Sequence, residues 1–144
     1  MDTLAATYAP GSPEADYWRA RHCLATTARH LNEKLVSADI TPELADTIRG
    51  DLERIVSRLE ACEQVSGLVE MGRKADRGTV DNVMGELVAM AGRSHPCAPQ
   101  LTWQEELNRI TGTVTFGQAF EGPPGHTHGG WVAGIFDHIM GMTH

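Results

Sequence analysis

Apolar residues near the N-terminus alternate at spacings of four and three, which is typical of one helical face. The residues that form this first stripe are Leu24, Ala28, Leu31 and Leu35. Ser12 supplies a side chain suited to cap a helix, and Pro13 fits the first helical position. The pattern therefore predicts a helix from Pro13 to Ala38.

A second stripe follows the same rule. Its members are Ile48, Leu52, Ile55, Leu59 and Cys62. The segment 39–43, DITPE, repeats the start signal, and Gly50 inside the helix costs only about 1 kcal/mol against alanine. Residues 1–68 are thus predicted to form an antiparallel helical hairpin. We expect it to pack on its own domain; a partner-binding coiled coil is the alternative.

Glycines interrupt the next part of the chain, residues 69–100. Helical spacing persists over Val80, Val83, Met84, Leu87 and Val88, which predicts one short helix. Two prolines in the segment 94–99, SHPCAP, then exclude helix and predict a linker.

The third part, residues 101–144, combines one strand with one helix. The segment 111–120, TGTVTFGQAF, is the convincing strand, and no second strand of that quality is evident. The loop 121–125, EGPPG, leads into an apolar helix that begins near Gly129. We expect this helix to continue to the last residue of the sequence. Since a stable sheet needs about three strands, we expect the others beyond His144 or from another chain. The predicted class is α+β.

Composition changes this picture little. The chain has 144 residues, a net charge of -7 and no basic stripe, so nucleic acid is not an expected partner. Three cysteines without a CxxC pair predict neither a disulfide framework nor a zinc site. With no leader and no apolar run of about 18 residues, we expect a cytoplasmic protein without a membrane partner.

The candidate chemistry lies at both ends of the last helix. Unpaired amides at a helix start, next to the glycines of His128-Gly129-Gly130, can hold an oxyanion, although the pair could also serve only a sharp turn. Asp137 is the lone acid among apolar residues, and burial there would make it a better general base. About 13 Å of helix separates His128 from Asp137, so one chain cannot complete a site. A two-fold dimer can complete two such sites.

These residues resemble a known family. The run 116–130, FGQAFEGPPGHTHGG, followed by Phe136-Asp137, is similar to PaaI-type hotdog thioesterases, and the segment 94–101, SHPCAPQL, is similar to their entry segment. The resemblance covers about the last third of the chain. It implies that the sequence holds the first strand and the central helix of a hotdog domain.

The resemblance also implies roles. The amide of Gly129 would polarise an acyl-CoA thioester, Asp137 would activate water or attack directly, and His128 would position the carbonyl. The residues that would contact the substrate are Gly130, His126, Pro124 and Gly125. It implies a homodimer or higher homo-oligomer, with no cofactor and no metal.

Other interpretations remain open. The histidines 126, 128, 138 and 144 suggest a metal site, but the acid that such a motif requires is replaced by Val132 and Ala133. A non-enzymatic assembly or binding module, or an inactive fragment, is the main alternative to the thioesterase. Cysteine nucleophile chemistry is set aside, because Cys97 sits between prolines without a helix terminus to activate it.

Overall fold

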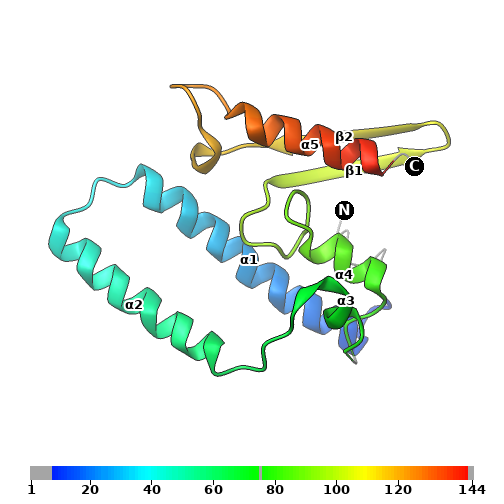
Figure 1. Cartoon of the computed structure of the whole chain (residues 1–144), viewed down its shortest axis with the longest axis horizontal. Coiled ribbons are helices and arrows are strands. Elements are labelled where there is room, and N and C mark those ends of the chain that lie inside the picture. The colour runs from blue at the N-terminus through cyan, green and yellow to red at the C-terminus, as the bar shows by residue number, and fades with distance from the viewer. Residues whose placement is uncertain (1–7, 75, 143–144) are drawn as a thin grey trace.

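The computed structural model describes residues 8–74 and 76–142, and it confirms a mixed α and β chain (Figure 1). The elements are α1 (Pro13–Ser37), α2 (Pro42–Glu60), α3 (Gly67–Gly72), α4 (Val80–Leu87), β1 (Gln100–Glu106), β2 (Arg109–Thr115), the 3-10 helix η2 (Gln118–Phe120) and α5 (Gly129–Gly141). The strands form one antiparallel pair, and the remainder is helix and loop.

The first two helices begin where the sequence predicts. The Ser12 hydroxyl accepts a hydrogen bond from the amide of Ala15 at 3.2 Å. Thr41 caps α2 in the same way, accepting from Leu44 at 3.3 Å. In both helices a proline follows the cap. Its missing N–H costs nothing there, because an N–H at the first helical position has no acceptor within the helix.

The buried face of α1 differs from the predicted apolar stripe. Trp18 and Ala25 are its buried residues, whereas Leu24 is 59% exposed. The cause is a polar contact, because Arg29, four residues after Ala25, donates to the carbonyls of residues 93 and 95 at 3.3 and 2.9 Å. Burial lowers the pKa of the Arg29 guanidinium. Hydrogen bonds, not only apolar contacts, thus select the face of α1 that the rest of the chain covers.

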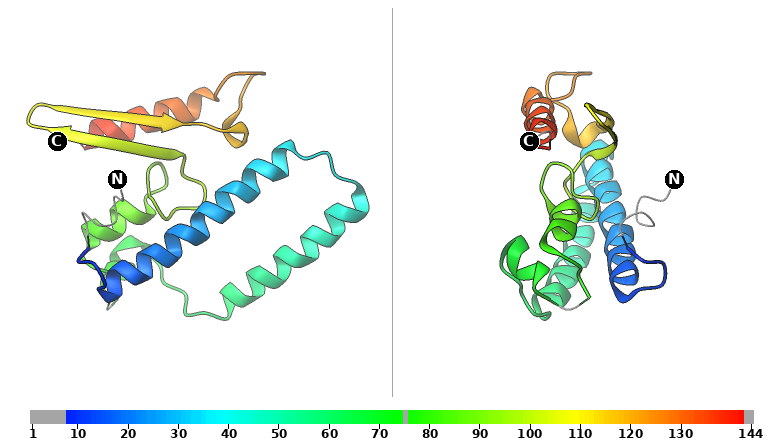
Figure 2. Two further views of the ribbon diagram at one scale, coloured as in Figure 1. Left: turned by 180° about the vertical axis from the view of Figure 1, so that it is seen from behind. Right: turned by 90° about the vertical axis from the view of Figure 1, so that its right-hand side faces the viewer.

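The prediction that the hairpin packs on its own domain is wrong for α2. This helix has no buried residue, and Ile55, Val56 and Leu59 are each about half exposed. In Figures 1 and 2, α2 runs alongside α1 but stands apart from it. The residues that the structure describes therefore cover the apolar stripe of α2 only in part, at the half-buried Ile48 and Leu52.

The core lies instead where α1 begins, against α3 and α4. Its buried members are Tyr8, Trp18 and Val83, joined by the partly buried side chains of Ala15, Tyr17, Leu68, Met71 and Leu87. The indole N–H of Trp18 donates to the carbonyl of Arg77 at 2.9 Å, and the Arg77 guanidinium lies 3.4 Å from the centre of the Tyr17 ring. The single helix predicted for residues 69–92 is thus two helices, of which α4 matches the expected spacing and α3 was missed.

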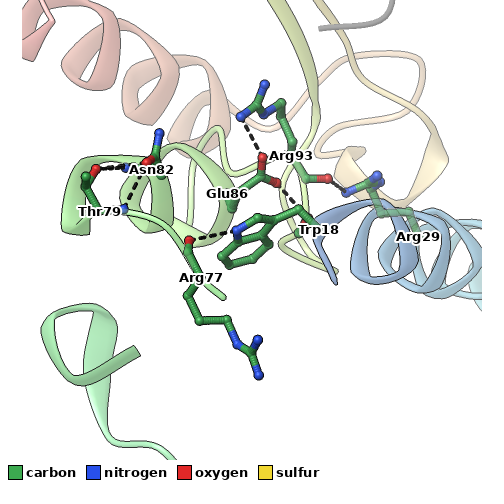
Figure 3. A network of polar contacts seen from close by, with 8 residues as sticks. Trp18, Arg29, Arg77, Thr79, Asn82, Glu86 and Arg93 are labelled. Atoms are coloured by element: carbon green, nitrogen blue, oxygen red, sulfur yellow. Dashed lines mark hydrogen bonds and ion pairs between the residues drawn. The ribbon is translucent and has the colours of Figure 1, made fainter. Parts of the chain in front are cut away.

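A buried carboxylate joins this core to the linker (Figure 3). Glu86 on α4 is fully buried, and its Oε1 lies 2.6 Å from the guanidinium of Arg93. Its Oε2 accepts a hydrogen bond from the Ser94 hydroxyl at 2.7 Å. The predicted linker has no regular secondary structure, but this network and Arg29 fix it on both sides.

Tyr8 gives the core a measurable pH dependence. Burial, assisted by the negative charge of Glu86, raises the pKa of the Tyr8 hydroxyl to about 12. The unfolded value is about 10, so the contribution of Tyr8 to stability is complete below pH 10 and is lost between about pH 10 and 12. We expect up to about 3 kcal/mol of the unfolding free energy to disappear over that range.

Tyr8→Phe isolates this effect. The hydroxyl makes no hydrogen bond to any residue that the structure describes, so the variant should be as stable as wild type at pH 8. Urea unfolding from pH 8 to pH 12 should then show a shallower loss of stability for the variant. Identical pH profiles for the two proteins would contradict the assignment.

The sheet is a tight hairpin. Residue pairing runs from Gln100 opposite Thr115 to Glu106 opposite Arg109, which leaves a two-residue turn. The predicted strand 111–120 is therefore shifted to Arg109–Thr115, with its end in η2, and the conclusion that no second strand exists was wrong. Strand β1 contains Thr102 and Trp103, which favour strands, but its glutamates do not, so the local signal is mixed and pairing with β2 determines the conformation. Helix α5 lies along this hairpin in both views of Figure 2.

Candidate active site

The segment before α5 closes on itself and so fixes where that helix begins. The amide of His128 donates to the carbonyl of Phe120 at 2.9 Å, and Glu121 and Thr127 form an isolated antiparallel bridge. Gly125 makes the turn between them with a φ of 74°, a conformation that favours glycine. The loop thus delivers His128 to the N-cap position of α5.

His128 caps the helix with its own side chain. Its Nδ1 accepts a hydrogen bond from the amide of Gly130 at 3.0 Å. In the neutral ring, acceptance at Nδ1 places the proton on Nε2, which is then a donor. The imidazole is exposed, so a molecule in solvent can reach this second nitrogen.

The amide of Gly129 is left unpaired. It makes no hydrogen bond within the part of the chain that the structure describes, and a Cβ built on Gly129 would meet nothing within 4 Å. It also lies at the positive end of the α5 dipole, which favours an anion or a developing oxyanion. The predicted oxyanion donor is therefore an open amide at a helix start.

Asp137 lies near the opposite end of α5. The side chain is exposed, so the expected burial among apolar neighbours is absent from the isolated chain. It does border a cavity of about 430 Å³ between α4, β1 and α5. The cavity is lined by Met84, Gly85, Val88, Ala91, Trp103, Asp137, His138, Gly141 and Met142. A carboxylate thus stands at the edge of a mainly apolar hollow.

Gly129 and Asp137 do not meet within one chain. Eight helical residues separate them, which is about 12 Å along the axis. This agrees with the geometry that the sequence predicts, in which a single chain offers the amide and the acid at two different places.

The other predicted substrate contacts gather around the loop tip. Pro124, Gly125 and His126 are exposed, and the Nδ1 of His126 lies 2.9 Å from the carbonyl of Pro124. Gly130 is exposed, but its amide is already engaged by His128. Of this group, the structure leaves His126 with one ring nitrogen directed away from its loop contact.

Sequence reasoning missed the residue that holds this region to α1. Both carboxylate oxygens of Glu33 accept hydrogen bonds from backbone amides at the start of η2, from Gln118 at 2.7 Å and Ala119 at 3.2 Å. Gly117 leaves room for this contact, since a Cβ there would overlap the Glu33 carboxylate and the carboxylate would have to shift. An acid within a long amphipathic helix gives no signal of such a distant contact.

Aromatic rings stiffen the same junction. Phe120 contacts Phe116 and Trp131 edge to face, with ring centres 5.6 and 4.9 Å apart. Trp131 follows the glycine pair, so this stack links the first turn of α5 to η2. A cavity of about 330 Å³ lies beside it, between α1, the linker and α5.

Among the described residues, no three His, Cys, Asp or Glu side chains lie where they could hold one metal ion, and His144 is outside that part. None of the helices in the ranges 8–74 and 76–142 is long and apolar enough to cross a membrane.

Comparisons with protein-family models, with curated proteins and with solved structures found no match to this chain.

Proposed function

We propose that the chain hydrolyses acyl-CoA thioesters as a two-fold dimer with the PaaI-type hotdog chemistry that its sequence resembles. The single observation that carries this proposal is the open Gly129 amide at the start of α5, beside an N-cap histidine whose second nitrogen is a donor. N–H donors in this place are what a thioester carbonyl needs as it becomes an oxyanion.

Asp137 supplies the base in this mechanism. Its carboxylate takes a proton from water while the water oxygen bonds to the thioester carbon, and the carbonyl oxygen becomes an oxyanion held by Gly129 and His128. The C–S bond then breaks as the oxyanion collapses. The sulfur leaves as a thiolate and takes the proton from Asp137, which gives CoA thiol and the free acid.

The dimer follows from the distance along α5. If two α5 helices run antiparallel, the Asp137 of each lies beside the Gly129 of the other, and the two-fold axis makes two equal sites. The cavity beside Asp137 is mainly apolar and suits the acyl group, while the exposed loop of Pro124, Gly125 and His126 faces the polar part of the substrate. The three exposed, free cysteines fit a reducing cytoplasm.

The test is release of free thiol from a panel of short, medium, long and aromatic acyl-CoAs by the 144-residue chain. We expect hydrolysis of at least one of them, with preference for acyl groups that fit about 430 Å³. The mass of the same sample, measured by light scattering, should be at least that of a dimer. A folded dimer that releases no thiol from any substrate would contradict the proposal.

The second candidate function is a non-enzymatic assembly module. One observation favours it: α2 presents its apolar stripe to solvent, which is the property of a helix that binds a partner. The acyl-CoA panel discriminates the two, since a module without an active site gives no thiol release.

A further inference from the structure

A mainly apolar groove runs along α2. It has a volume of about 450 Å³, and its walls are α2, the end of α1 and the connection between them. The apolar residues that line it are Leu35, Ile40, Ala45, Ile48, Leu52 and Val56. Neither the proposed site nor the core of the chain uses this surface.

We propose that this groove binds the α2 helix of a second copy of the chain, with the two helices antiparallel. The apolar stripe of α2 has the spacing of a coiled-coil seam, which is a surface for another helix. Antiparallel pairing sets Ile48 opposite Leu59 of the second copy and Leu52 opposite its Ile55, and the two-fold axis repeats each pair. The helix is thus self-complementary in its apolar row.

The charges beside the row are self-complementary as well. The same register places Asp51 and Arg58 of the two copies on one flank, where each acid faces an arginine. Arg58 makes no ion pair in the described part of its own chain, whereas Arg49 pairs with Asp46 and Glu53. The side chain of Arg58 is therefore available to the second copy. Asp51 is paired with Arg54 in its own chain, so its carboxylate would be shared between Arg54 and Arg58 of the second copy.

The other occupants fit less well. A membrane-bound helix is typically rich in Lys and Arg on its polar face, but on α2 the acids outnumber the arginines five to three. A helix pair of this length, with Leu35 and Ile40 at its edge, buries on the order of 600 Å² per copy, near the ~800 Å² of a standard specific interface. The contact is large enough for a dimer and independent of the proposed α5 contact.

Ile55→Arg tests the pairing of the two α2 helices, because Ile55 belongs to the apolar row beside the groove and does not line the groove itself. Two arginines would enter the apolar row of each pair, so the dissociation constant should rise by at least about 100-fold. Folding should be unaffected, because α2 has no buried residue. Sedimentation velocity should show half the wild-type mass if the α2 and α5 contacts join different pairs of copies. If both contacts join the same two copies, the α5 contact keeps the mass of a dimer, and the disulfide described below is the deciding test. Leu107→Arg is the matched control, since that side chain is 98% exposed at the β turn, and its mass should not change.

Two further variants fix the register. Arg58→Asp should weaken association, and Asp51→Arg added to it should restore association, because the acid and the arginine have then exchanged places.

In a Cys23→Ser, Cys97→Ser background, Ala45→Cys should form an intermolecular disulfide with native Cys62, which antiparallel pairing places opposite it. A monomeric wild type at about 100 µM, or a mass unchanged by Ile55→Arg without that disulfide, would overturn the proposal. A monomeric wild type would also contradict the dimer on which the proposed hydrolysis rests, whereas an unchanged mass without that disulfide would leave thiol release from the acyl-CoA panel unaffected. A Cys62 to Cys62 disulfide would instead show parallel pairing and refute the register.

Discussion

Asp137→Asn is expected to lower kcat/KM for acyl-CoA hydrolysis by about a thousandfold, since a neutral amide cannot take the proton from the attacking water. The exposed position of Asp137 means that folding should be unchanged. Thiol release under steady-state conditions measures the loss, with circular dichroism as the check on structure. Asp39→Asn, at another exposed aspartate, is the matched control and should keep full activity. Wild-type turnover in the Asp137 variant would remove this residue from the mechanism.

The dimer makes a sharper version of this experiment possible. Gly129→Pro removes the amide proton at the first helical position, where proline is tolerated, and the extended ψ of 127° at His128 suits a following proline. Each variant should be inactive by itself. A mixture that has exchanged subunits should recover about a quarter of the wild-type rate, because half of the dimers are mixed and each holds one intact site. Gly129→Ala keeps the N–H and should remain active.

No recovery in the mixture, with subunit exchange verified by mass, would mean that Gly129 and Asp137 act within one chain or not together. Recovery would establish that the amide and the acid of one site come from different copies. The experiment therefore separates the role of the dimer from the role of each residue.

Glu86→Ala is expected to lower the free energy of unfolding by about 3–5 kcal/mol, more than any other substitution proposed for this chain. The carboxylate is fully buried, so its removal breaks the 2.6 Å ion pair with Arg93 and takes the acceptor from the Ser94 hydroxyl. Urea unfolding at pH 7 measures the change. Glu53→Ala removes a carboxylate from an exposed ion pair with Arg49 and is the matched control.

The control should leave the unfolding midpoint unchanged, because exposed ion pairs contribute little. Equally small changes in the free energy of unfolding for both substitutions would show that the contacts of Glu86 do not stabilise the fold. A third variant, Glu86→Gln, keeps the shape and the Ser94 contact while removing the charge, and it should fall between the other two.

Local signals predicted the helix starts well. Ser12 and Thr41 each precede a proline, and both side chains cap the helices that follow. His128-Gly129 likewise placed the start of α5 correctly. These features depend on a few neighbouring residues, so a short segment of sequence is enough to predict them.

Tertiary features could not be predicted in the same way. Strand β1 has the polar sequence QLTWQEE and exists because β2 pairs with it across a two-residue turn, for which Asn108 was the available signal. The face of α1 depends on Arg29 and Glu33, whose acceptors and donors lie more than 60 residues away. The exposed position of Asp137 could not be inferred either, since periodicity places residues on one face without saying whether anything covers it.

The bond between Glu33 and the amide of Gln118 has a consequence for how the chain folds. It joins residues 85 positions apart, and closing so long a loop costs chain entropy before the hydrogen bond can stabilise the fold. Helices α1 and α2 can form from local interactions within microseconds, but η2 and the start of α5 can dock only after this closure. During synthesis, the carboxylate of Glu33 therefore stays without these partners until Gln118 and Ala119 have left the ribosome.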